Sequence, residues 1–220
     1  MGRAKLIQDD VRFLLFSEVY QRLEEPRARR KAFLLVDATI QCLSRKGFDG
    51  VTLEMISREA AVSRPLINHY FKDLEDLLDC AVKYIRLLFQ RVVVEQTVKE
   101  KDEVQMLASY VRTCFAWIDG FRVHGEVWLS LLHRCSRGKK YRTLNTLAVQ
   151  TGSQRITTMI QLGIDHGFMN CSEPAVRAKM IQTLITGAMV TYSTEEIEDP
   201  KRYVVDVISQ CLAIVGAKVS

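Results

Sequence analysis

Apolar residues recur at intervals of three and four residues along almost all of this 220-residue chain. That spacing gathers them on one face of an α-helix, whereas the strict alternation of a half-buried β-strand is scarce. Only four prolines and eleven glycines are present, so few positions interrupt a helix. With 48% apolar and 26% charged residues, the chain can bury a core of ordinary size. The sequence therefore predicts an all-α protein.

Breaks in the apolar spacing divide the chain into predicted helices. Pro26 ends the first helix and Gly47 ends the second. Asp73, Ser172 and Asp199 stand where later helices begin, and their side chains can accept from unpaired backbone N–H groups. The predicted helices span 9–23, 27–46, two short segments within 53–71, 73–95, 104–121, 124–135, 141–166, 174–192 and 200–216.

The stretch from Val51 to Phe71 contains the two short helices in close succession. Helical apolar spacing starts at Leu53, stops after two turns and restarts at Leu66. Ser63 offers a capping hydroxyl to the second helix, and a proline costs little in a first turn because its N–H would be unpaired there. Two short helices joined by a tight turn are typical of a helix-turn-helix.

The second of these helices carries side chains that can hydrogen-bond to phosphates or base edges. They are Arg64, Asn68, His69 and Tyr70, which we expect on its outward face. For His69 and Tyr70 the alternative is packing at the helix junction. For Arg64 the alternative is a solvated surface. This helix is the predicted recognition helix.

The positive charge of the chain is concentrated around this motif. Residues 26–72 hold nine Lys and Arg against four Asp and Glu, a net charge of +5, which equals that of the whole chain. Four of the cations, Arg27, Arg29, Arg30 and Lys31, stand at the start of a predicted helix, where the helix dipole disfavours them. They face either a polyanion or screening solvent. The distribution favours a polyanionic partner.

The first 25 residues form an extension with an amphipathic helix, whose apolar face includes Val11, Leu14, Leu15 and Val19. This face covers either the chain's own core or a partner subunit or DNA. No apolar run has the length of a membrane span, and the first 30 residues lack the features of a signal peptide. We expect a cytoplasmic protein.

The spacing of cysteine, histidine and carboxylate residues does not predict a metal, cofactor or catalytic site. The six cysteines are scattered without a C-x-x-C pair, which argues against a zinc module and favours buried thiols over a redox sensor. His124 and His133 are nine residues apart, which is not a metal-ligand spacing. No nucleophile, histidine and carboxylate stand at catalytic spacing. We expect no metal, no cofactor and no enzymatic activity.

Several short segments occur at the spacing of a known family: Val36-Asp37-Ala38, Lys46-Gly47-Phe48, Val51-Thr52, Ile56, Ala60-Ala61-Val62-Ser63, His69-Tyr70-Phe71 and Leu77-Leu78. Residues 30–80 thereby resemble the amino-terminal domain of the TetR (tetracycline repressor) family of bacterial transcriptional regulators. The resemblance implies a homodimer whose recognition helices enter successive major grooves of double-stranded DNA. It implies three regions: an extension over 1–25, a three-helix DNA-binding domain over 26–73, and a larger helical effector-binding and dimerisation domain over 74–220, with dimer contacts in 173–216.

The resemblance also assigns DNA contacts residue by residue. Thr52 and Tyr70 would bind phosphate, and Arg64, Pro65, Asn68 and His69 would face the groove, with Ser63 beside them. Three positions depart from the family pattern: Ala61 replaces a glycine, Asn68 replaces a frequent aromatic residue, and Leu74 replaces a phosphate-binding lysine. Asn68 can instead read adenine, and Lys72 can take over the phosphate contact.

Downstream aromatic and thioether side chains could line an apolar effector pocket, although an ordinary core has the same composition. The candidates are Phe115, Trp117, Phe121, Trp128, Met159 and Met189. The leading interpretation is a ligand-responsive regulator, a repressor released from a palindromic operator by a small apolar effector. The alternative is a DNA-binding adaptor that responds to a protein partner through its first helix or a basic loop at 137–140.

Overall fold

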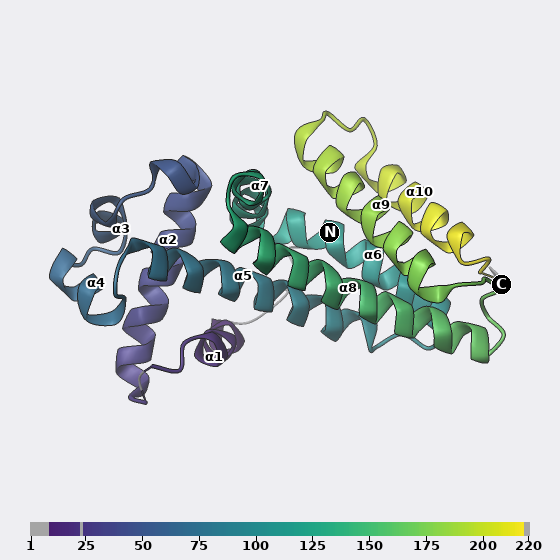
Figure 1. Cartoon of the computed structure of the whole chain (residues 1–220), viewed down its shortest axis with the longest axis horizontal. Coiled ribbons are helices and arrows are strands. Elements are labelled where there is room, and N and C mark those ends of the chain that lie inside the picture. Colours follow the sequence, from purple (N-terminus) through teal and green to yellow (C-terminus); the bar gives the residue numbers. More distant parts are fainter. Residues whose placement is uncertain (1–8, 23, 218–220) are drawn as a thin grey trace. The chain divides into compact units, whose positions relative to one another are not determined.

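A computed structural model describes residues 9–22 and 24–217, and within these ranges it contains ten helices and no strand (Figure 1). The helices are α1 (Asp9–Val19), α2 (Pro26–Gly50), α3 (Leu53–Glu59), α4 (Arg64–Tyr70), α5 (Leu74–Thr97), α6 (Glu103–Gly120), α7 (Arg122–Arg137), α8 (Lys139–Asp165), α9 (Pro174–Thr194) and α10 (Pro200–Ile214). The all-α prediction is confirmed, and the predicted helices lie within a few residues of the observed ones.

The chain forms two compact units. The first contains the described residues up to Gln90 together with Gly120–Gly138, and so holds α1 to α4, most of α5, and α7. The second contains Arg91–Asp119 and the described residues from Lys139 onward. The family resemblance in the sequence implies a domain boundary at residue 73. The first compact unit extends beyond it to Gln90, and side chains of α5 such as Leu77 and Tyr84 are fully buried there.

Helix α1 packs onto its own unit through aromatic side chains. Phe16 is fully buried, and its ring lies 5.3 Å from that of Phe33 and 6.3 Å from that of Tyr84. Arg12 donates to Asp37 at 3.0 Å and to the Tyr84 hydroxyl at 3.3 Å. Of the two alternatives for the extension, packing on the chain's own core therefore holds for the described residues of this helix.

Helix α2 begins with a proline in its first turn and buries a broad stripe, including Leu35, Val36, Ile40 and Leu43. Gly47 has a φ of +65° and interrupts the regular helix, which confirms it as the stop predicted from the sequence. A β-carbon there would also lie 3.3 Å from the Ser130 hydroxyl oxygen of α7, which packs against α2.

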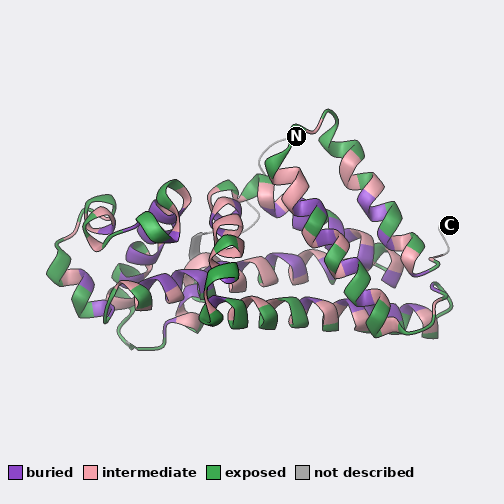
Figure 2. Cartoon of the chain, turned by 45° about the horizontal axis from the view of Figure 1, so that its top comes forward, coloured by how far each residue is buried: buried purple, intermediate pink, exposed green. Residues whose placement is uncertain are grey.

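In the second unit α8 packs against α9 and α9 against α10, and their buried faces point inward (Figure 2). Asp199 caps α10 as predicted, accepting from the N–H groups of Lys201 and Arg202 at 3.1 and 3.0 Å. The predicted cap by Ser172 is wrong. Glu173 occupies the cap position with a φ of +55°, and its carbonyl oxygen accepts from Val176 N–H at 2.9 Å.

The basic stretch at 137–140 is also not a loop of that length. Helix α7 ends at Arg137 and α8 begins at Lys139, so Gly138 alone separates them. Within the described residues, no helix is both long enough and apolar enough to cross a bilayer.

Candidate nucleic-acid interface

Buried isoleucines attach the two short helices α3 and α4 to the first unit. Ile56 of α3 and Ile67 of α4 are both fully buried. Thr52 is exposed and caps α3, its hydroxyl oxygen accepting from Met55 N–H at 3.3 Å. One side of each helix is thereby fixed, and the opposite side faces solvent.

The turn between the helices is tight and internally hydrogen-bonded. Val62 N–H donates to the Ser57 carbonyl oxygen at 3.0 Å, and the Ser57 hydroxyl donates back to the Val62 carbonyl oxygen at 2.6 Å. Ala61 lies in the left-handed region with a φ of +52°. A residue with a β-carbon costs about 1–2 kcal/mol in that conformation, which explains why glycine suits this position. The turn nevertheless forms in this chain with Ala61 in place of the glycine.

Helix α4 presents a continuous polar face to solvent. Ser63, Arg64, Pro65, Asn68 and His69 are all exposed, and for Arg64, Asn68 and His69 this is the outward position predicted from the sequence. The predicted capping bond of the Ser63 hydroxyl is not formed. Pro65 has no N–H to offer, and Leu66 N–H instead donates to the backbone carbonyl of Ser63 at 3.0 Å. The Ser63 side chain is therefore not used to cap this helix.

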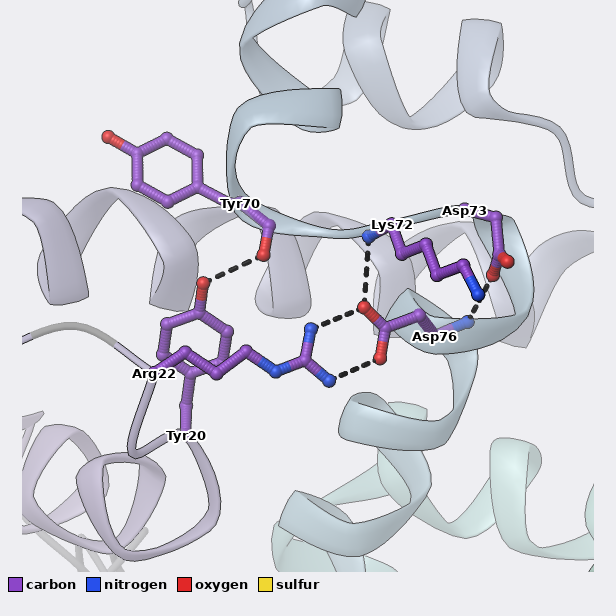
Figure 3. Close-up of polar contacts among 6 residues, drawn as sticks. All are labelled: Tyr20, Arg22, Tyr70, Lys72, Asp73 and Asp76. Carbon is purple, nitrogen blue, oxygen red and sulfur yellow. Dashed lines mark hydrogen bonds and ion pairs between the residues drawn. The ribbon is translucent and has the colours of Figure 1, made fainter.

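Tyr70 corrects the predicted outward face of the recognition helix. It is only 7% exposed, and its ring contacts the His69 ring edge to face at a centroid distance of 4.9 Å. Its backbone carbonyl oxygen accepts from the Tyr20 hydroxyl at 2.8 Å (Figure 3). Packing at the helix junction, the alternative for this residue, is what the structure shows.

The junction between α4 and α5 is held by carboxylates. Asp73 caps α5 as predicted, accepting from Asp76 N–H at 2.8 Å, and Asp76 accepts from Lys72 N–H at 3.0 Å. Arg22 contacts both oxygens of the Asp76 carboxylate (Figure 3). This contact lowers the pKa of Asp76, because hydrogen bonds from a cation favour the ionised carboxylate. Leu74 is half-buried and Lys72 is exposed.

The cations around the motif divide into paired and unpaired groups. Arg58 pairs with Glu54 and Arg45 with Glu59. Within the described part of the chain, neither Arg64 nor Lys72 forms an ion pair with another side chain. These two cations therefore remain able to contact phosphate without breaking an internal contact.

The basic cluster at the start of α2 is partly engaged by its own chain. Arg29 donates to the Glu24 carbonyl oxygen at 2.6 Å, and the Arg30 guanidinium lies 4.8 Å from the centre of the Phe13 ring. Arg27 and Lys31 are exposed. Half of the predicted polyanion-facing cluster therefore has an internal role. Sequence reasoning missed these contacts because they depend on where α1 and its following loop fold.

The six candidate pocket residues do not fall in one unit. Phe115, Trp117, Met159 and Met189 are at most 5% exposed and belong to the second unit. Phe121 and Trp128 are half-buried and belong to the first. Phe115 packs edge-on against Tyr192 and Tyr203, at 5.2 and 6.1 Å, as in an ordinary core.

A surface groove lies between α9 and α10. The sequence predicts dimer contacts in this region but no groove. It is lined by Thr183, Leu184, Gly187, Ala188, Thr191, Tyr203, Asp206, Val207 and Gln210. Its lining includes Gly187, which has no side chain, and Ala188, which has only a methyl group, and these two small residues are the one signal the sequence carries for the groove. Elsewhere on the same two helices Val176, Met180 and Val205 are exposed apolar residues.

The cysteines have the character of buried apolar residues. Five of the six are buried, and Cys171 is half-buried. Burial raises the pKa of Cys80, Cys114 and Cys211 to about 12, so these thiols stay protonated and unreactive near neutral pH. Among the described residues no group of three or more His, Cys, Asp or Glu is placed to hold a metal ion.

Comparison with known proteins also points to a helix-turn-helix at α3 and α4. Residues 35–80 match the family model described as bacterial regulatory proteins, tetR family. The HTH-type transcriptional regulator BetI of Cronobacter sakazakii is 29% identical over 141 residues, covering 57% of this chain and 66% of that protein. BetI of Serratia proteamaculans is 39% identical over 51 residues, covering 23% of this chain and 26% of that protein. The chain thus matches less than two thirds of the length of these relatives.

Solved structures extend the likeness to the whole fold. A TetR-family regulator from Cytophaga hutchinsonii has a TM-score of 0.78 at 17% identity, covering 90% of this chain and 100% of that one. A transcriptional regulator from Saccharomonospora viridis in complex with choline has a TM-score of 0.70 at 19% identity, covering 82% and 92%. Residues 35–80 thus match the amino-terminal domain of the tetR family of bacterial regulatory proteins, and the chain shares the fold of solved TetR-family regulators.

Proposed function

We propose that this chain is a sequence-specific DNA-binding regulator, a repressor released from a palindromic operator by a small apolar effector. The observation that carries the proposal is the exposed polar face of α4. Arg64, Asn68 and His69 project from a helix whose other side is buried through Ile67. A helix of this kind fits the major groove, and its arginine and amide groups match the hydrogen-bonding edges of guanine and adenine.

Contacts to the DNA backbone come from residues that flank this face. Thr52 lies at the start of α3 and Lys72 after the end of α4, and both are exposed. Lys72 replaces the missing lysine at position 74. The ring of Tyr70 is largely buried, so only its hydroxyl is available for a phosphate contact. Tyr70 is therefore a secondary member of the proposed set of backbone contacts.

A palindromic operator requires two copies of the chain. We infer that they associate through residues 173–216, where α9 and α10 carry the exposed apolar residues Val176, Met180 and Val205 as well as the groove. Exposed apolar side chains on neighbouring helices are a feature of subunit interfaces, and a two-fold axis would pair the same surface on both copies. Paired subunits place two recognition helices on one operator, and the proposal locates this assembly in the cytoplasm.

The effector site is proposed among the buried side chains of the second unit. Phe115, Trp117, Met159 and Met189 offer aromatic and thioether surface that suits an apolar ligand. Phe121 and Trp128 belong to the other unit and are weaker candidates. The structure similar to this chain that holds choline makes choline one compound to test beside apolar ligands.

Selection of bound duplexes from a random pool tests the proposal. We expect an enriched palindrome, bound by the purified chain with an affinity that falls as salt rises, and released by a small molecule. The absence of any enriched sequence would contradict DNA reading. If no small molecule releases the chain from DNA but a protein fraction does, the regulator responds to a protein partner and not to a small effector.

A further inference from the structure

The carboxyl end of the recognition helix is held from outside the family's matched segment. The last carbonyl groups of a helix lack partners within it. One of these, on Tyr70, accepts from the Tyr20 hydroxyl at 2.8 Å in a buried position, 50 residues away along the chain. The match to the family model begins at residue 35, so Tyr20 lies before it.

Tyr20 is itself fixed in position. It is 2% exposed, its ring stacks on Phe16 at 5.3 Å and 16°, and it meets the Phe71 ring at 5.3 Å. Burial raises the pKa of Tyr20 to about 12, so its hydroxyl keeps the proton it donates to Tyr70. A hydrogen bond from a rigid, buried donor constrains where α4 ends, and therefore in which direction α4 points its exposed side chains.

Arg22, two residues further on, controls the charge of the same junction. Its side chain is 53% exposed and that of Asp76 is 18% exposed, and the two form a two-point contact. Asp76 also accepts from the backbone N–H of Lys72, the proposed phosphate contact. Without Arg22, the Asp76 carboxylate would lose the cation that contacts both of its oxygens, and beside Lys72 its charge would repel a phosphate backbone more strongly.

We propose that Tyr20 and Arg22 are positioning residues for DNA reading. Tyr20 orients the recognition helix through the Tyr70 carbonyl group, and Arg22 neutralises Asp76 next to Lys72. This inference rests on the proposed function and adds to it a role for residues that precede the helix-turn-helix. Figure 3 shows both contacts converging on the segment from Tyr70 to Asp76.

The first test compares Tyr20→Phe with the unmodified chain on the selected operator and on an unrelated duplex. Loss of the hydroxyl removes one hydrogen bond and keeps the ring, so we expect operator affinity to fall roughly three- to tenfold while affinity for the unrelated duplex is unchanged. Tyr192→Phe is the control, since it removes a hydroxyl that bonds to Asp119 in the other unit. A purely structural role would lower the melting temperature and leave the specificity ratio of the folded protein unchanged.

The second test separates charge neutralisation from direct contact. We expect Arg22→Gln to weaken operator binding roughly fivefold, and Asp76→Asn to remove that loss in the double variant, because no carboxylate then needs neutralising. Arg91→Gln is the matched control, with a side chain 52% exposed and paired with Glu95 in the other unit. If Arg22→Gln weakens binding equally with and without Asp76→Asn, the neutralising role of Arg22 is overturned.

The two proposals fail in different ways. If the unmodified chain enriches no duplex, the proposed function fails. If it binds its operator and both Tyr20→Phe and Arg22→Gln bind like their controls, the positioning role fails while the proposed function stands. Thermal unfolding of each variant shows that the binding assay is made on folded protein, and both substitutions keep most of the side-chain volume.

Discussion

The ring of Phe16 in α1 meets the ring of Tyr84 in α5 edge-on, with centroids 6.3 Å apart and planes inclined by 72°. Both residues are fully buried, although 68 positions separate them in the sequence. Edge-to-face pairs of this kind add to the stabilisation from burial itself. Helix α1 is therefore a part of the core of its unit, even though it lies before the segment that carries the family resemblance.

Phe16→Ala tests that conclusion. Removal of a fully buried phenyl ring leaves a cavity, so we expect the free energy of unfolding to fall by about 3–5 kcal/mol. Leu14→Ala is the control on the same helix, because Leu14 is 62% exposed and its loss should change stability by no more than about 0.5 kcal/mol. Denaturant unfolding of both variants measures the difference. Equal stabilities would mean that α1 does not pack as described.

Local signals in the sequence predicted much of the fold. Apolar spacing located the helices, and Asp73 and Asp199 cap as expected because a cap depends on residues two or three positions away. The side of α4 that Tyr70 faces was not predictable in the same way. In a helix of seven residues, spacing alone does not decide this, and the hydrogen bond that holds Tyr70 comes from Tyr20, which is distant in sequence.

The sequence predicted the candidate DNA-facing residues better than it predicted the candidate effector pocket. The candidates Ser63, Arg64, Pro65, Asn68 and His69 are neighbours in one short helix and its cap, so they share an exposed face by local geometry. The pocket candidates came from residue type across many helices. Which unit each helix joins depends on tertiary packing, and that packing separates Phe121 and Trp128 from the other four.

His124 gives the stability of the protein a predicted pH dependence. It is 6% exposed, and burial, with a smaller effect of the Arg12 charge, lowers its pKa to about 4. Between pH 6.5 and 4 the unfolded chain binds a proton at His124 that the folded protein does not. Acidification across this range should therefore reduce the free energy of unfolding, by about 3 kcal/mol at most.

Unfolding measured at several pH values checks this expectation. The His124→Gln variant has no imidazole at this position, so its free energy of unfolding should not show the loss between pH 6.5 and 4 that His124 causes. His133 is exposed, and the His133→Gln variant should still show that loss. If the His124→Gln variant and the unmodified chain lose stability in parallel between pH 6.5 and 4, His124 is not the buried neutral group described.

The proposed dimer interface predicts a difference between two similarly exposed residues. Met180 of α9 is 46% exposed and Leu147 of α8 is 48% exposed. Met180→Glu would bury an unpaired charge in the interface and should raise the dimer dissociation constant more than roughly tenfold. Leu147→Glu should leave association unchanged. Sedimentation equilibrium measures both constants, and an equal effect of the two substitutions would exclude 173–216 as the interface.

The central claim, that α4 reads bases, is tested most directly by repeating the duplex selection with Asn68→Ala. Asn68 is exposed on α4, and its carboxamide can form two hydrogen bonds with adenine, worth about 1–3 kcal/mol of discrimination. The account predicts that one position in each half of the palindrome loses its base preference while the remaining positions keep theirs. A consensus identical to that of the unmodified chain would contradict base reading by Asn68 from α4.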